Sequence, residues 1–276
     1  MSADLLFWGG FALKMVMTAA VVVITSVAVE RSGPFAGALI GALPTAAGAA
    51  YTILALEHPP AFIAASAIGS LAINGAVAVF AAVYALLAQR HGLTVSLGGA
   101  AIVWFAIAAA LGLVEWTPLT AVAFNVAIYA VTIPVSWRFR GSARPVTFVR
   151  TRFDIPLRAL TAALVVAVVT AASSSIGSFA SGMFALFPII LGSSIVIMHP
   201  RIGGKATASM LAHVQLPLIG LALGFLAVHY LVAPIGVWPA LAAGLLVCLA
   251  WSGLLLILRL RQQKREQAMS ASPTAP

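Results

Sequence analysis

Long apolar segments recur along the whole chain, and they constrain the fold more than any other feature of the sequence. They are separated by short polar breaks, such as residues 57–60, 89–92 and 115–118. Each segment has roughly 19 to 28 residues, enough to cross a hydrocarbon core as a helix. Only 8% of the 276 residues are charged, which is far below the roughly 25% of soluble domains. The sequence therefore predicts an all-α, polytopic membrane protein.

Counting apolar segments between the polar breaks predicts about nine transmembrane helices. They lie near residues 8–29, 34–56, 61–88, 95–114, 117–137, 155–173, 177–198, 206–231 and 236–258. No basic region precedes the first segment, so we expect it to be a spanning helix and not a cleaved signal. The tail, residues 261–276, is polar, and we expect it to be disordered.

The positions of the basic residues predict the orientation of these helices. With nine crossings and the N-terminus outside, every one of the 15 lysines and arginines except Lys14 faces the cytoplasm. The opposite orientation would reverse this distribution, against the preference for positive charge inside. We therefore predict a multi-pass protein of a bacterial inner membrane, with its N-terminus outside and its C-terminus cytoplasmic. Such scattered orienting charges also argue against nucleic-acid binding.

Two segments of the chain resemble each other. The stretch SGPFAGALIGALPTAAG covers residues 32–48, and IGSFASGMFALFPIILG covers residues 176–192. Both keep a glycine, a Phe-Ala pair, a proline and a final glycine at the same spacing. The same shift of 144 residues also pairs Lys14 with Arg158. This pattern predicts an internal repeat, with a first unit over residues 1–116 and a second over residues 155–260.

The two units are expected to have opposite orientations in the membrane. Each contains four helices, so each ends on the side where it began. Residues 117–154 supply one linker helix and a basic cytoplasmic loop, and this extra crossing starts the second unit from the opposite face. Inverted repeats of this kind are common in secondary transporters, where two similar halves open a central site to each side in turn.

The matched prolines mark a candidate substrate site. Pro44 and Pro188 occupy equivalent helices, with Gly48 and Gly192 one turn later. Proline removes a backbone donor and clashes with the preceding turn, so each helix should kink or break. For either helix alone this is ordinary membrane-helix structure. A matched pair in inverted repeats instead indicates a binding site near the middle of the membrane.

Polar residues inside the apolar segments extend this candidate site. Lys14 and Arg158 either extend their charges to the membrane surface or attract an anionic substrate from opposite sides. His213 and Gln215 share one helix with Pro217, and His213 is either a hydrogen-bonded interior residue or a proton carrier. The last candidate, Ser193, lies among serines that could satisfy freed carbonyls or bind a ligand. We expect another polar pair, Asn74 and Asn125, to form hydrogen bonds between helices.

The sequence lacks the residues that several classes of function require. The six acidic residues lie at chain ends or in predicted loops, which argues against carboxylate catalysis inside the membrane. The chain has no Walker, HExxH or GxSxG motif and no clustered metal ligands. We therefore predict no enzymatic activity, no cofactor and no metal site. The single cysteine, Cys248, lies in an apolar segment and is expected to pack as a small hydrophobic residue.

The string ERSGPFAGALIGALPTAAG, which follows one apolar helix and precedes an acidic turn, resembles the small bacterial four-helix membrane proteins called GlpM-like. Gly33, Pro34, Gly37 and Pro44 fit the pattern of that family. The resemblance covers residues 13–113, and it reaches residues 157–258 only through the repeat. The family is associated in name with alginate production, and it implies a four-helix unit without an activity to carry over. The arrangement also resembles fused dual-topology transporters and channels.

These observations predict secondary transport of a small, anionic solute by alternating access. A passive channel and a non-transporting accessory subunit in cell-envelope assembly stay open as alternatives. The partners expected are the lipid bilayer and a small-molecule solute, with proton coupling through His213 as one option. The sequence leaves the oligomeric state and the substrate open.

Overall fold

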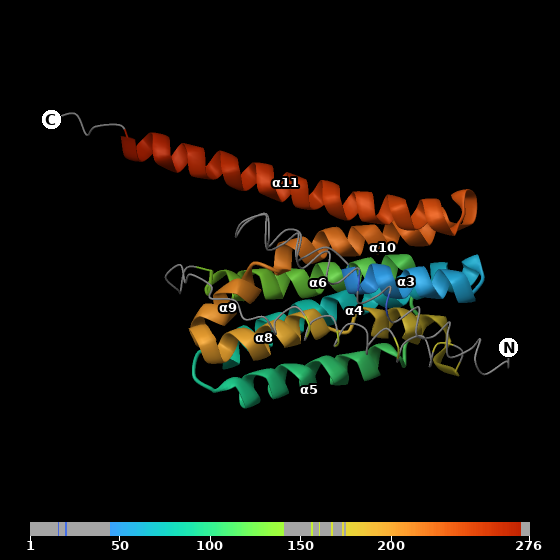
Figure 1. The fold of residues 1–276 in the computed structure, drawn as a ribbon, viewed down its shortest axis with the longest axis horizontal. Coiled ribbons are helices and arrows are strands. Elements are labelled where there is room, and N and C mark those ends of the chain that lie inside the picture. Colours follow the sequence, from blue (N-terminus) through green and yellow to red (C-terminus); the bar gives the residue numbers. More distant parts are fainter. Residues whose placement is uncertain are drawn as a thin grey trace.

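A computed structural model describes residues 45–140 and 175–271 of the chain, together with the single residues 16, 20, 156, 160, 167 and 173. Within these residues every regular element is an α-helix (Figure 1). The helices are α3 (Thr45–Glu57), α4 (Pro60–Leu87), α5 (Leu93–Leu111), α6 (Pro118–Trp137), α8 (Ile189–Ile202), α9 (Gly204–Ala212), α10 (Gln215–Ile235) and α11 (Val237–Ala271). A further helical segment, residues 175–185, precedes α8.

Five of the described helices are long and apolar enough to cross a membrane, namely α4, α5, α6, α10 and α11. They confirm the predicted all-helical class and indicate a membrane protein. The described helices pack roughly along one common direction (Figure 1). Of the other predicted crossings, those over residues 8–29, 34–56 and 155–173 lie wholly or partly outside the described residues. The crossing predicted over residues 177–198 is described, and it consists of two shorter helical stretches, residues 175–185 and α8.

The helix boundaries follow from local sequence signals. The helix α6 begins with a capping box, in which the Thr117 hydroxyl accepts from the backbone N–H of Thr120 and the Thr120 hydroxyl accepts from that of Thr117. Proline occupies the first turn of α4 and of α6, where its missing N–H costs no hydrogen bond. The helices α9 and α11 follow Gly203 and Gly236, whose φ angles of 83° and 86° favour glycine.

The central helix of the bundle is α4. It contacts α5, α6, α9 and α10, and small residues dominate its sequence. Its backbone approaches the segment 175–185 very closely, because a Cβ atom built on Gly69 would meet the carbonyl of Phe179, and one on Gly182 would meet the carbonyl of Ser66. Such close approach through small residues is the usual way in which membrane helices gain packing contacts.

Hydrogen bonds to α4 define the directions of its neighbours. Ala64, Asn74 and Ala78 of α4 are bonded respectively to His229, Leu218 and Gln215. Residue numbers rise along α4 as they fall along α10, so these two helices are antiparallel. Towards the segment 175–185 the numbers rise together, because Ser66 is bonded to Ser178 and Ser70 to Gly182. The segment 175–185 therefore runs parallel to α4.

The helix interruption predicted at Pro188 is confirmed. The segment 175–185 ends before Pro188, and α8 begins with Ile189 directly after it. The amide of Gly192 then donates to the carbonyl of Pro188 at 2.8 Å, which restores the helical hydrogen bonding. Pro44 lies outside the described residues, which resume at Thr45.

A second interruption differs from the prediction of one continuous helix over residues 206–231. Residues 213 and 214 form a turn that separates α9 from α10. The cause is Pro217, which has no N–H to donate to the carbonyl of His213 and whose ring crowds that carbonyl. The amide of Leu218 donates to the carbonyl of Val214 at 3.2 Å, so α10 is regular from there onwards.

The C-terminal helix also differs from the sequence-based prediction. Residues 261–271 of the tail, which we expected to be disordered, continue α11 to Ala271. Lysine, arginine, glutamine and glutamate are good helix formers. Because α11 already exists, extending it needs no new helix nucleus.

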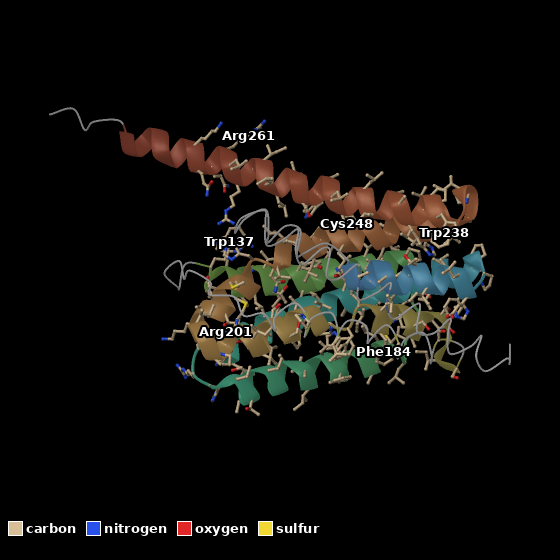
Figure 2. The ribbon with its side chains drawn as sticks, viewed as in Figure 1. Trp137, Phe184, Arg201, Trp238, Cys248 and Arg261 are labelled. Carbon is tan, nitrogen blue, oxygen red and sulfur yellow. The ribbon has the colours of Figure 1, made fainter. Side chains whose placement is uncertain are left out.

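Basic residues of the described helices gather at one end of the bundle. Arg201 and Arg261 lie at that end together with Trp137, whereas Trp238 lies at the opposite end (Figure 2). The two tryptophan side chains are about half exposed, at 56% and 50%. Exposed tryptophans at both ends of an apolar bundle are typical of the two membrane–water interfaces.

Candidate functional site

A buried polar cluster joins the middle of α4 and of α6 to the first turn of α10. The Asn74 amide nitrogen lies 2.7 Å from the Tyr129 hydroxyl oxygen, 3.0 Å from the Leu218 carbonyl oxygen and 3.3 Å from the Asn125 side-chain oxygen. The Asn125 amide in turn donates to the carbonyls of Leu71 and Ala121. The hydrogen bonding between helices predicted for Asn74 and Asn125 is therefore confirmed.

Gln215 forms a second polar contact at the helix interruption. It is the first residue of α10 and is fully buried. Its side-chain nitrogen donates to the carbonyl of Ala78 in α4 at 3.0 Å. This bond attaches the start of α10 to the central helix, close to the Asn74 cluster.

A third set of hydrogen bonds connects three helices through Ser70. The Ser70 hydroxyl donates to the carbonyl of Gly182 at 2.6 Å, and the Tyr51 hydroxyl lies 2.8 Å from the Ser70 oxygen. Because the Ser70 hydrogen is directed at Gly182, Tyr51 is the donor in the second bond. This relay joins α3 to the segment 175–185, which belong to the second and seventh predicted crossings.

The structure describes only some of the residues of the predicted substrate site. Pro188 caps α8, Gly192 lies in its first turn, and the neighbouring Ser193 is buried at 7% exposure. Gly48 lies in α3, and its backbone oxygen accepts from the Thr52 hydroxyl. Pro44, Lys14 and Arg158 lie outside the described residues.

His213 occupies the turn between α9 and α10. Its Nδ1 lies 2.8 Å from the carbonyl oxygen of Ser209. A carbonyl only accepts hydrogen bonds, so Nδ1 carries a hydrogen in this geometry and Nε2 is left to take up a second proton. His213 is half-buried, in a position to change charge next to the interrupted backbone.

Arg140 lies beside this turn. Its Nε is 3.4 Å from the carbonyl oxygen of Ala212, and its own carbonyl accepts from the Ser209 hydroxyl. The guanidinium also stacks 4.1 Å from the ring centre of Trp137. Burial lowers the pKa of Arg140, and the charge of Arg259 lowers it further. Arg140 therefore links the end of α6 to the C-terminal end of α9.

Sequence reasoning identified Asn125 but missed the rest of the buried polar face of α6. Asn125, Tyr129, Thr132 and Ser136 are all buried, at 7% exposure or less. Their spacing of four, three and four residues places them on one face of the helix. The signal was present in the sequence, because a polar residue recurs at each helical turn of an otherwise apolar segment.

Among the described residues, no group of three or more histidine, cysteine, aspartate or glutamate side chains could hold a metal ion. Cys248 is buried and donates to the carbonyl of Gly220, in agreement with a packing role. No known family model, curated protein or solved structure matches the chain. The resemblance to GlpM-like proteins stays a prediction.

Proposed function

We propose that this protein is a secondary transporter of a small, anionic solute, built from two inverted repeats. The observation that carries the proposal is a match between helix boundaries. Two helices of the second unit, α9 and α11, begin at Gly204 and Val237. Each start lies 144 residues after a start in the first unit, namely Pro60 of α4 and Leu93 of α5. The spacing is the one that the two similar sequence strings predict.

Helix directions support the inverted relation. The repeat makes α4 equivalent to α9 and α10 together, and hydrogen bonding shows that α4 and α10 are antiparallel. Asn74 is bonded to Leu218, which lies 144 residues later in the chain. Contact between two equivalent residues is expected where helices cross on a pseudo-two-fold axis in the membrane plane.

The orientation and location follow from the same arrangement. With nine crossings, the end of the bundle that carries Arg201 and Arg261 (Figure 2) is the cytoplasmic end. The protein then has its N-terminus outside and its C-terminus inside a bacterial inner membrane. Lys14 and Arg158 would present one positive charge towards each side, which favours an anionic solute.

Alternating access needs elements that can change shape. The second unit has two interrupted helices, at Pro188 and at residues 213–214. Interrupted helices expose backbone groups to a substrate and act as hinges at the interface of inverted repeats. The relay from Tyr51 through Ser70 to Gly182 joins the second and seventh crossings, between which we place the substrate site.

Flux measurements test this function directly. Purified protein in proteoliposomes is screened against organic anions, amino acids and drugs, first by thermal shift and then by uptake of any hit. A transporter should give saturable uptake and counterflow, in which unlabelled solute inside accelerates entry of labelled solute. Flux without saturation and counterflow would favour a channel. Absence of flux, together with co-purification of a partner, would favour an accessory subunit in envelope assembly.

Replacing His213 with alanine is expected to flatten the dependence of uptake on pH. Its Nε2 is the proton-accepting atom beside the interrupted helix. Burial lowers the pKa of His213, and the charges of Arg140 and Arg259 lower it further, so its removal should flatten the profile mainly on the acidic side. Initial uptake rates between about pH 5 and 8 provide the measurement, with His91→Ala as the control, because His91 lies in the exposed turn before α5. An unchanged pH profile in His213→Ala would remove this residue as the proton carrier.

A further inference from the structure

Among the described residues, four buried side-chain oxygens of α4, α6 and α10 have no hydrogen-bond partner. They are Asn74 Oδ1, Thr132 Oγ1, Ser136 Oγ and Gln215 Oε1. Each belongs to a residue that is at most 5% exposed. An unpaired buried polar atom lowers the folding stability by about 1–3 kcal/mol. A ligand that contacts several of these four oxygens would therefore stabilise the protein.

The orientation of the two amides is fixed by their partners. The side-chain nitrogens of Asn74 and Gln215 face the backbone carbonyls of Leu218 and Ala78. A backbone carbonyl accepts hydrogen bonds and donates none, so exchanging the nitrogen and oxygen of either amide would bring two acceptors together. Both amide oxygens are therefore acceptors without a donor.

Helix geometry places three of these oxygens at neighbouring heights along the axis of the bundle. Asn74 contacts Tyr129 of α6 and Leu218 of α10. Thr132 follows Tyr129 by three residues in α6, and Gln215 precedes Leu218 by three residues in α10. The helix α6 is parallel to α4, because Leu71 is bonded to Asn125 and Asn74 to Tyr129, so α6 and α10 are antiparallel. Both steps therefore lead towards the same end of the bundle. At about 1.5 Å per residue, each step is about 4.5 Å. Gln215 and Thr132 thus lie about one turn from Asn74.

This set of ligands suits a small monovalent cation. All of the oxygens are neutral, from amides and hydroxyls, whereas calcium and magnesium sites use carboxylates. Glu57, the last residue of α3, and Glu115, which precedes α6, lie at the end of the bundle where α4 and α6 begin, away from these oxygens. The carbonyl of Ala212 at the end of α9 already accepts from Arg140, so the neutral side-chain oxygens are the ligands available to the ion.

We infer that Asn74, Thr132 and Gln215 bind a small monovalent cation such as Na⁺ between α4, α6 and α10. Ser136, one turn further along α6, extends the row of unpaired oxygens towards the basic end of the bundle. Use of this ion to drive solute uptake rests on the proposed function, whereas the binding itself does not.

The test is thermal unfolding of the purified full-length protein in NaCl or choline chloride at equal ionic strength. Sodium should raise the melting temperature in a saturable way. Thr132→Val keeps the shape of the side chain and removes one ligand oxygen, so it should weaken the apparent sodium affinity about ten-fold. Without sodium, this variant should be at least as stable as the wild type, because an unpaired buried hydroxyl is gone.

Two further variants make the result specific. Thr132→Ser retains the hydroxyl and should retain the response to sodium. Ser252→Ala removes a buried hydroxyl of α11 and should leave the response unchanged. Equal melting temperatures in sodium and choline would overturn the inference. So would a full sodium response in both Thr132→Val and Gln215→Leu, because the ion would then bind elsewhere.

The outcome separates this site from the transport proposal. Sodium stabilisation that depends on Thr132, in a protein with no solute flux under any gradient, would leave the cation site standing and contradict transport. Saturable uptake that is identical in sodium and choline, in a protein that sodium does not stabilise, would support transport and contradict the cation site.

Discussion

Changing both Pro44 and Pro188 to alanine is expected to reduce solute uptake at least ten-fold while the protein still inserts into the membrane. Alanine supplies the missing N–H and removes the ring, so the gap between residues 185 and 189 should close into a continuous helix. Hinge residues of this kind affect turnover more than assembly. Initial uptake rates, normalised to the amount of protein in the membrane fraction, provide the measurement.

The matched control is Pro134→Ala. Pro134 lies inside α6, which is the linker helix of the proposed repeat and has no counterpart in it. It should therefore change uptake by less than about two-fold, as expected for a residue outside the hinges. Wild-type uptake in the double variant would remove the paired prolines from the transport cycle.

Changing Gly182 to alanine is expected to lower the melting temperature by roughly 5 °C, because overpacking a tight contact costs about 1–3 kcal/mol. The added Cβ atom would meet the backbone carbonyl of Ser66. A carbonyl inside α4 cannot move as a flexible side chain would, so the two helices must separate. Separation would also stretch the hydrogen bond from Ser70 to the Gly182 carbonyl.

Gly253→Ala is the control for this prediction. Among the described atoms, none lies within 4 Å of a Cβ built on Gly253 in α11. Alanine is the better helix former, by about 1 kcal/mol, so Gly253→Ala should melt at the wild-type temperature or above it. The melting temperatures are measured by intrinsic tryptophan fluorescence. Equal values for the two variants would contradict the close contact between α4 and residues 175–185.

The apolar segments made the helical class and most helix boundaries predictable. Polar breaks and prolines placed the starts of α4, α6 and α11 within a few residues, because a helix in lipid must satisfy its backbone internally. The interruption at Pro188 was equally readable. The one at residues 213–214 was not, although Pro217 was visible, since the tertiary bond from Gln215 to Ala78 helps to hold it.

The candidate site was less accessible to sequence reasoning. Asn74 and Asn125 were recognisable as amides in apolar segments. Threonine and serine are common in membrane helices, so Thr132 and Ser136 alone did not indicate a site. Their importance comes from three helices facing one another, with α4 between α6 and α10. Partnerships of that kind depend on the rotation of each helix about its axis, which composition and hydropathy do not determine.

The most direct test of the inverted architecture is the location of the two chain ends. With the single cysteine Cys248 changed to alanine, cysteines introduced by Ser2→Cys and Ser270→Cys are labelled with a membrane-impermeant maleimide. Two four-helix units joined by one linker helix predict that residue 2 reacts in intact spheroplasts and that residue 270 reacts only after permeabilisation. Labelling of both positions from the same side would mean an even number of crossings, and the two units could not then be inverted copies.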